Sequence, residues 1–165
     1  MALTPSGAIS LGAINTALNR SATAPISMND AQVRFLANQD SGSVNMNAMR
    51  NKQSTAGTVT VGVYDDGKSA FYGFSLNFIG SVTSNSFFGG TLYEILTDVN
   101  AGGISFFSSG EVQIPNIPAR AKIGSSTYTV EYNIQNGTQY VAINGGVFFQ
   151  AGNIGQTLSF QFAQT

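Results

Sequence analysis

The sequence contains no cysteine, which excludes disulfide bonds, thiolate zinc sites and cysteine nucleophiles. It contains no histidine either, so the commonest general base and the commonest transition-metal ligand are both missing. Tryptophan, the residue that stacking sites for sugars favour, is also absent. We therefore expect no catalytic residues, no cofactor and no metal ligands, and we expect the chain not to be an enzyme.

Charged residues are scarce as well. They make up 9% of the chain, against about 25% in an ordinary soluble domain. The formal net charge of -1 gives no overall attraction to nucleic acid or to an anionic membrane. No hydrophobic run approaches the length of a membrane-spanning helix, so we expect no membrane insertion. Because a surface of neutral polar groups costs little to desolvate, it favours permanent assembly, and we expect a homo-oligomer.

A short phrase occurs three times near the start of the chain. Ser-Gly-Ala-Ile-Ser-Leu at residues 6–11 returns as Ser-Gly-Ser-Val-Asn-Met at residues 41–46, and Pro-Ile-Ser-Met at residues 25–28 is a looser copy. Each copy places a β-branched residue before a Ser or Asn and an apolar residue after it. A Ser or Asn in this position can cap a helix, so each copy predicts a helix start.

The predicted helices begin after Ser10, Ser27 and Asn45, and each is about two turns long. Helices this short are not stable alone in water. Residues 1–52 are therefore expected to form a small helical anchoring module that packs against another chain or against the β-domain. Its apolar face and two of its arginines are expected to bind that partner: Ile9, Leu11, Ile14, Ile26, Met28, Val33, Arg34, Val44, Met46, Met49 and Arg50.

Charged side chains in the module have expected local roles. Asp30 follows Ser27 by three residues, which predicts a reciprocal capping pair. Arg20, Arg34 and Arg50 lie near the ends of the three copies, where a cation stabilises a helix C-terminus. Contact with an acidic partner surface is the alternative for these arginines, and neither role excludes the other.

After residues 51–57, a polar stretch that we interpret as a linker, the pattern changes to alternation. Val59, Val61 and Val63 alternate with small or polar residues, which is typical of a half-buried strand. Asp-Asp-Gly at residues 65–67 predicts a hairpin turn. Short strands with close turns predict a sandwich or a barrel rather than βαβ units. Of the two we expect the sandwich: a mainly β fold in which residues 58–165 form an antiparallel, jelly-roll-like β-sandwich after the small module of short helices. Further strands are expected at residues 74–78, 91–97, 103–107, 111–114, 119–123, 127–134, 140–143, 146–150 and 157–162.

One catalytic motif matches by its letters. Residues 62–69 fit the G-x-x-x-x-G-K-[ST] pattern of a phosphate-binding loop. That loop needs a buried parallel strand before it and a helix after it, so that amides and the helix dipole face the phosphate. Here both flanking segments resemble strands, and two adjacent aspartates would repel a phosphate. We therefore interpret the segment as a hairpin with a solvated Lys68.

The remaining candidate groups are weaker. Acidic side chains could supply the pair of carboxyl groups of a glycosidase, but no spacing singles out two of them, and scattered surface carboxylates are favoured. Asp30 and Asp40 match no calcium-binding loop. Tyrosines could form a sugar-binding platform, although packing is favoured for most of them. The acidic candidates are Asp65, Asp66, Glu94, Asp98, Glu111 and Glu131, and the tyrosines are Tyr64, Tyr72, Tyr93, Tyr128, Tyr132 and Tyr140.

The repeated phrases resemble an N-terminal segment shared by virion structural proteins of tailed bacteriophages. In that group a Ser-Gly and Ile-Ser phrase leads to Ile-Asn and Arg-Ser, an Ile-Ser-x-Asn-Asp phrase leads to Val-Arg, and a last Ser-Gly phrase ends near a Lys. This chain has Ala17 and Asn19 where the group often has Glu and Gly, and Asn51 where Gly is common. The matching phrases occupy residues 6–21, 26–34 and 41–52.

The resemblance implies a non-enzymatic structural component of a phage virion, anchored by residues 1–52. Its implied partners are other virion proteins of the portal, neck, tail or capsid, and resemblance to phage fibres favours a trimer. Its implied location is the virion, assembled in the host cytoplasm. The alternative is a receptor- or glycan-binding tip module of a tail fibre, which would contact a host-surface glycan. No catalytic residue belongs to the shared motif.

Overall fold

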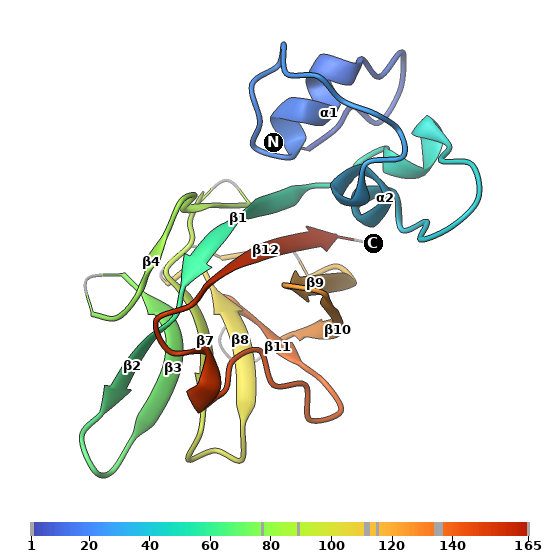
Figure 1. The fold of residues 1–165 in the computed structure, drawn as a ribbon. Coiled ribbons are helices and arrows are strands. Elements are labelled where there is room, and N and C mark those ends of the chain that lie inside the picture. Colours follow the sequence, from blue (N-terminus) through green and yellow to red (C-terminus); the bar gives the residue numbers. More distant parts are fainter. Residues whose placement is uncertain are drawn as a thin grey trace.

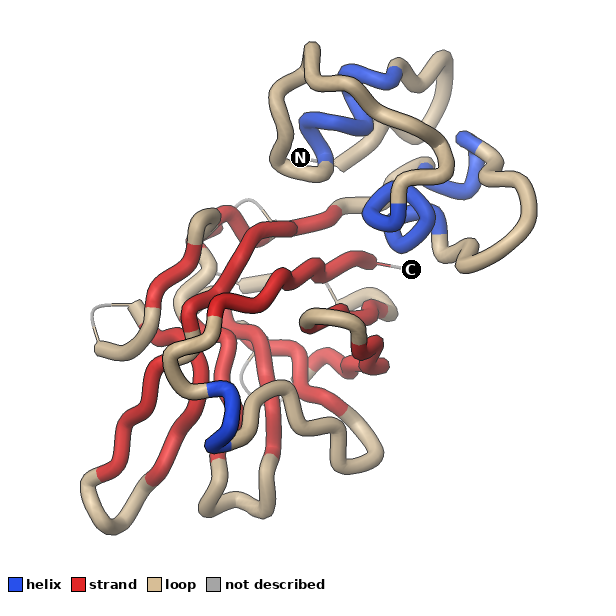
Figure 2. The backbone as a smooth tube through the Cα atoms, viewed as in Figure 1, coloured by secondary structure: helices blue, strands red, loops and turns tan. Residues whose placement is uncertain are grey.

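The computed structural model describes residues 2–76, 78–88, 90–110, 113–114, 116–133 and 137–164 of the protein. A small helical module, formed by residues 2–52, lies over one end of a curved sheet that the rest of the chain forms (Figure 1). Among the described residues, the helices belong to the module, apart from one short turn near the C-terminus (Figure 2). No described helix is long and apolar enough to cross a membrane.

The module contains the α-helices α1 (Leu11–Ala17) and α2 (Ala31–Ala37) and the 3₁₀ turn η1 (Met46–Met49). Two of the predicted caps are confirmed. The side-chain oxygens of Ser10 and Asn45 accept hydrogen bonds from first-turn N–H groups at 3.0 and 2.9 Å. The local pattern therefore sets where α1 and η1 begin.

The predicted cap at Ser27 is wrong. The residue that caps α2 is Asp30, whose carboxylate accepts a hydrogen bond from the Gln32 N–H at 3.0 Å. The Ser27 hydroxyl instead accepts from the Asn29 N–H at 3.1 Å, within the turn that precedes the helix. Ser and Asp cap helices about equally well, so the local pattern alone does not decide between two positions three residues apart, and the predicted reciprocal pair of Ser27 and Asp30 does not form.

The rest of the chain forms mainly antiparallel strands. The first strand begins at residue 54, inside the stretch that we interpreted as a linker. Residues 54–57 therefore belong to a strand and not to a linker. The strands are β1 (Ser54–Thr60), β2 (Gly62–Asp65), β3 (Ala70–Ser75), β4 (Ser81–Val82), β5 (Ser86–Phe87), β6 (Gly90–Thr91), β7 (Glu94–Asp98), β8 (Ile104–Ser108), β9 (Ala119–Ile123), β10 (Ser126–Tyr132), β11 (Gln139–Ala142) and β12 (Thr157–Gln164), with the 3₁₀ turn η2 (Ala151–Asn153) before the last.

Ten of these strands form one sheet in the order β2-β3-β7-β8-β11-β10-β9-β12-β1-β4, while β5 and β6 pair separately. β1 and β2 follow one another in the chain, but β1 pairs with β12 and β2 pairs with β3. The sheet therefore curls until it nearly closes at this one bent segment (Figure 1). The prediction of a mainly β, antiparallel fold is confirmed. A jelly-roll-like sandwich consists of two packed sheets, whereas these ten strands share one continuous sheet. The sandwich therefore stays a prediction.

Several predicted strands differ in their limits. The alternation of the valines continues through Val61 but ends at the bend, so that Val63 is exposed. β3 ends at Ser75, and the turn that follows leaves Phe78 75% exposed. The strand predicted at residues 146–150 is irregular, and that at residues 111–114 lies partly outside the described residues.

The irregular segment has a physical cause. The Phe148 N–H donates to the Ser105 hydroxyl at 2.8 Å, and the Phe149 N–H donates to the Thr97 hydroxyl at 3.0 Å. These two buried hydroxyls also hydrogen-bond to each other at 2.8 Å. Side chains of β7 and β8 therefore satisfy the N–H groups that a strand ladder would otherwise use.

The core of the sheet is aromatic. The ring centroid of the fully buried Phe162 lies 4.9 Å from those of Phe107 and Tyr140, in tilted arrangements that aromatic rings favour. The module has a separate apolar cluster of its own. Its buried members are Leu3, Ile9, Ile14, Ala17, Leu18, Val33, Leu36, Ala37 and Met49.

Two glycines allow the bend between β1 and β2. A Cβ at Gly62 would meet the backbone N of Gly80, and a Cβ at Gly80 would lie 2.5 Å from the Thr60 carbonyl oxygen. Gly80 also has a φ of +64°, which favours glycine. The turn after β3 can therefore lie directly against the backbone of the bend.

We expect Gly62→Ala to lower the free energy of unfolding by about 2–3 kcal/mol, because the new methyl group must displace backbone atoms. Gly152→Ala is the matched control: its Cβ would meet nothing within 4 Å, and its φ is ordinary. We expect this control to change stability by less than about 0.5 kcal/mol. Urea denaturation measures both values, and equal effects would contradict the proposed close contact.

Candidate functional site

Three arginines, one at the end of each copy of the repeated phrase, hold the module together. Each guanidinium reaches the next copy along the chain, and the last one reaches back to the first. We call this set of contacts the arginine ring. It consists of Arg20 Nη1 with the Asp30 carboxylate (2.8 Å), Arg34 Nη2 with the Gly42 carbonyl (2.9 Å) and Arg50 Nη2 with the Gly7 carbonyl (2.5 Å).

The two carbonyls in the ring come from the Ser-Gly pair of the first and third copies. Gly7 and Gly42 have φ values of +80° and +74°, so the repeated glycine supplies the same backbone conformation twice. Arg34 is the one member of the ring in the last turn of a helix, as expected for a dipole contact. Arg20 and Arg50 lie beyond the helix ends and connect segments instead.

The residues predicted to bind a partner mostly build the module itself. Ile9, Ile14, Val33 and Met49 are buried in its apolar cluster, and Arg34 and Arg50 belong to the arginine ring. Leu11 is 46% exposed. The remaining four pack against the cluster while keeping part of their surface accessible: Ile26, Met28, Val44 and Met46.

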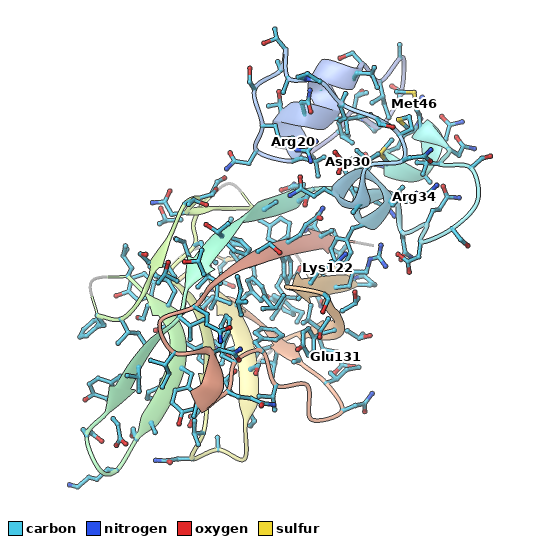
Figure 3. The ribbon with its side chains drawn as sticks, in the orientation of Figure 1. Arg20, Asp30, Arg34, Met46, Lys122 and Glu131 are labelled. Atoms are coloured by element: carbon cyan, nitrogen blue, oxygen red, sulfur yellow. The ribbon has the colours of Figure 1, made fainter. Side chains whose placement is uncertain are left out.

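The partner-binding role of these residues therefore stays a prediction. The surface available for it consists of Leu11 and the four half-buried side chains, because Ile14, Val33 and Met49 contact their own module. Met46 lies on the side of the module away from the sheet, whereas Arg20 and Asp30 lie together near it (Figure 3).

Arg120 of β9 joins the module to the sheet. Its Nη2 donates to the Phe35 carbonyl at 2.6 Å, and its guanidinium carbon lies 4.1 Å from the centroid of the Phe35 ring. Its Nη1 lies 3.5 Å from the Asp40 carboxylate. Burial lowers the pKa of Arg120, while the Asp40 carboxylate acts against this shift. A guanidinium stays charged under such conditions, so a buried cation fixes the end of α2.

Lys52 binds the same helix end. Its Nζ donates to the carbonyl of Ala37, the last residue of α2, at 3.3 Å. Burial lowers the pKa of Lys52, and nearby Arg120 lowers it further. The last carbonyls of a helix lack helical partners and carry partial negative charge, so two cations stabilise them. Gln161 of β12 adds a hydrogen bond from Nε2 to the Gln32 carbonyl at 3.0 Å.

A groove of about 690 Å³ opens beside this junction. We call it the polar groove, because most of its lining residues carry a hydroxyl, amide or charged group, although apolar atoms also line it. Sequence reasoning missed it, since it depends on where the module sits on the sheet. Its lining residues are Asn38, Asn116, Ile117, Pro118, Ala119, Arg120, Thr127, Thr129, Val130, Glu131 and Tyr132.

A second groove, of about 370 Å³, lies over β2, β3, β7 and β8. We call it the aromatic groove. The Ser75 hydroxyl donates to the Glu94 carboxylate in it at 3.1 Å. Burial raises the pKa of Glu94, and the Ser75 hydrogen bond acts against this rise. The groove is lined by Tyr64, Phe71, Ser75, Phe78, Ile79, Glu94, Leu96 and Phe106.

The segment with the letters of a phosphate-binding loop forms the hairpin between β2 and β3, as predicted. The Asp66 carboxylate accepts hydrogen bonds from the N–H groups of Lys68 and Ser69 at 2.9 and 2.7 Å. These hydrogen bonds lower the pKa of Asp66. The amides that a phosphate would use therefore bind a carboxylate of the same turn.

The other acidic candidates lie on different elements. Asp98 accepts hydrogen bonds from two N–H groups of the turn after β7, Glu94 lies in the aromatic groove, and Glu131 lies on β10. Glu111 lies outside the described residues. Across the described residues, no three acidic side chains are grouped so that they could hold a metal ion.

Most of the tyrosines pack, as the sequence favoured. Tyr140 is fully buried in the core of the sheet. Tyr72, Tyr128 and Tyr132 are partly buried and pack against that core. Tyr64 differs, because it is 40% exposed and lines the aromatic groove. No platform of all six tyrosines forms in the described structure.

Comparison with protein-family models, with curated proteins and with solved structures finds no match to this chain. Its function is therefore argued from the residues and their geometry. Two features stand out: the module, with its junction to the sheet, and the two grooves.

We expect Asp30→Asn to remove a pH-dependent part of the stability. Asn keeps the cap of α2 but loses the charge that pairs with Arg20. Because Arg20 lowers the pKa of Asp30 in the folded state, this pair stabilises the fold above the unfolded pKa. That stability is lost as the pH falls through the folded pKa.

The expected difference is about 0.5–1 kcal/mol at neutral pH, since both side chains are partly exposed. It should shrink as the pH falls through the lowered pKa of folded Asp30, below which the carboxyl group is protonated in both states. Denaturation of both proteins across this pH range measures the difference. A constant difference at all pH values would contradict the assignment of the charge effect to this pair.

We expect Arg120→Ala to weaken the junction by about 2 kcal/mol, because it leaves the Phe35 carbonyl without this donor. Lys122→Ala is the matched control on the same face of β9. The readout is hydrogen exchange of the α2 amides, which we expect to become about tenfold faster or more in Arg120→Ala and to stay unchanged in the control. Equal exchange in both variants would contradict the role of Arg120.

Proposed function

We propose that this chain is a non-enzymatic structural component of a tailed-phage virion, in which residues 1–52 anchor the protein and residues 58–165 present a β-domain. The order and spacing of the three repeated phrases carry the proposal. The arginine ring supports it, because each phrase ends in an arginine that reaches the next phrase. The repeat therefore encodes one folded unit.

The geometry of the module supports an anchoring role. The module has its own apolar cluster and lies at one end of the sheet, so it can contact another protein without disturbing the strands. Leu11 and the half-buried Met28 and Met46 supply apolar surface for that contact. The proposed partners are other virion proteins of the portal, neck, tail or capsid. The proposed assembly is a homo-oligomer, with a trimer favoured, and its location is the virion.

The proposed β-domain is a flattened, sandwich-like form of the continuous sheet, with the aromatic core between its two sides. Few charged side chains lie along its strands to prevent edge-to-edge pairing with other chains. This suits a protein whose sheet edges are covered by neighbouring subunits. The chain holds 9% charged residues overall, so little electrostatic repulsion opposes such packing.

The second candidate function is a receptor- or glycan-binding tip. The polar groove favours it, because the hydroxyls of Thr127 and Thr129, the amide of Asn116 and the carboxylate of Glu131 line it beside Tyr132. Groups of this kind can exchange hydrogen bonds with sugar hydroxyls. A glycan array probed with the whole chain and with Thr129→Val tests this candidate: lower binding by the variant supports it.

The test of the structural function is incorporation into particles. Chains carrying Leu11→Glu are expected to be left out of purified virions, because a charge in the contact surface costs binding energy. Ile154→Glu is the matched control, since Ile154 is 42% exposed and lies outside the module, while Leu11 is 46% exposed. Mass spectrometry of the particles measures incorporation, and cryo-EM gives the copy number.

Normal incorporation of Leu11→Glu, or loss of both variants, would contradict anchoring through the module. Absence of the wild-type chain from the particles would contradict the structural function itself.

A further inference from the structure

The aromatic groove is built from the outer faces of four neighbouring strands. The residues that alternate with its lining, such as Ile95 and Phe107, belong to the core of the sheet. Strand register therefore sets its floor and walls. The register places Tyr64 opposite Phe71, Leu96 opposite Phe106, and Ser75 opposite Glu94.

The turn after β3 adds a further side to the groove, beside the four strands. Phe78 and Ile79 line the groove from this turn, which Gly80 holds against the backbone of Gly62. Phe78 is 75% exposed, so most of its ring is accessible to a ligand. The Tyr64 and Phe71 ring centroids lie 6.2 Å apart, and they form one end of the wall.

The described part of the aromatic groove carries negative charge only. Among the described residues that line it, Glu94 is the one with a carboxyl group, and none is a lysine or an arginine. Burial raises the pKa of Glu94, which shows that its charged form is poorly solvated. Of the described residues, Ser75 is the one that hydrogen-bonds to this carboxylate. A ligand that brings a positive charge would therefore offset the cost of burying the carboxylate.

The walls decide which cation fits. A primary ammonium ion is strongly hydrated and needs several acceptors, and the groove offers mainly Glu94 and the hydroxyls of Ser75 and Tyr64. An alkylated ammonium ion is weakly hydrated, and the faces of aromatic rings attract it. Four aromatic rings and one carboxylate match that ion. An anion would be repelled by Glu94.

We propose that the aromatic groove binds a small-molecule quaternary ammonium compound, with Glu94 opposite the charge and the rings of Phe71, Phe78 and Phe106 around the alkyl groups. This site is separate from the module and from the polar groove. It is independent of the proposed structural function, and either can hold without the other.

The probe is choline, compared with 3,3-dimethylbutan-1-ol, a neutral alcohol of the same shape. Both are titrated into the full chain, and binding is followed by isothermal calorimetry and by amide NMR shifts of β3 and β7. We expect choline to bind about tenfold or more tightly than the neutral alcohol, because the alcohol keeps the shape without the charge.

Three variants locate the site. Glu94→Gln should weaken choline binding about tenfold while leaving binding of the neutral alcohol unchanged. Phe78→Ala should weaken choline binding too, and it is expected to fold normally, because this side chain is exposed. Asp98→Asn is the control, since Asp98 lies on the same strand as Glu94 but outside the groove. We expect it to bind choline as the wild type does.

Several results would overturn the proposal. Equal affinity for choline and the neutral alcohol would show an apolar groove with no preference for charge. Tighter binding of ethanolamine, or of a methyl hexoside, would assign the groove to a primary amine or to a sugar. No detectable binding of choline, or equal weakening by Asp98→Asn, would also count against the site.

Discussion

The hydrogen bonds from each arginine to the next copy of the repeat, together with the apolar cluster, join the three segments of the module. Helices of two turns are unstable alone, because nucleation is costly and few hydrogen bonds follow. The arginine ring replaces helix length with tertiary contacts: each guanidinium has several donors and can reach across a loop to a carbonyl or carboxylate. The apolar cluster of the module packs between the same segments.

A second constraint acts at the bend between β1 and β2. Only a backbone without side chains can approach as closely as Gly62 and Gly80 do, so these glycines allow the sheet to curl and nearly close. The same contact fixes the turn that carries Phe78. Closure of the sheet and the shape of the aromatic groove therefore share one cause.

Local patterns predicted the local parts of this structure. The caps at Ser10 and Asn45 and the hairpin at residues 65–67 depend on neighbouring residues and were predicted correctly. The start of α2 was predicted wrongly, because Ser and Asp both cap helices well. The contact with Arg20 favours Asp30 over Ser27. The irregular segment at residues 146–150 depends on hydroxyls of distant strands, and the grooves depend on register and on the placement of the module. No periodicity in the sequence carries that information.

The small number of cations links these parts. Of the seven lysines and arginines in the sequence, five use their side chains to make hydrogen bonds or ion pairs with other described residues: Arg20, Arg34, Arg50, Lys52 and Arg120. Four of these five donate to backbone carbonyls, and two carbonyls belong to the end of α2. Positive charge is thus used to fold the module and to attach it to the sheet. Glu94, on the opposite part of the sheet, has no cation among the residues that line its groove. The proposed cationic ligand would bring to Glu94 the positive charge that the described lining of the groove lacks.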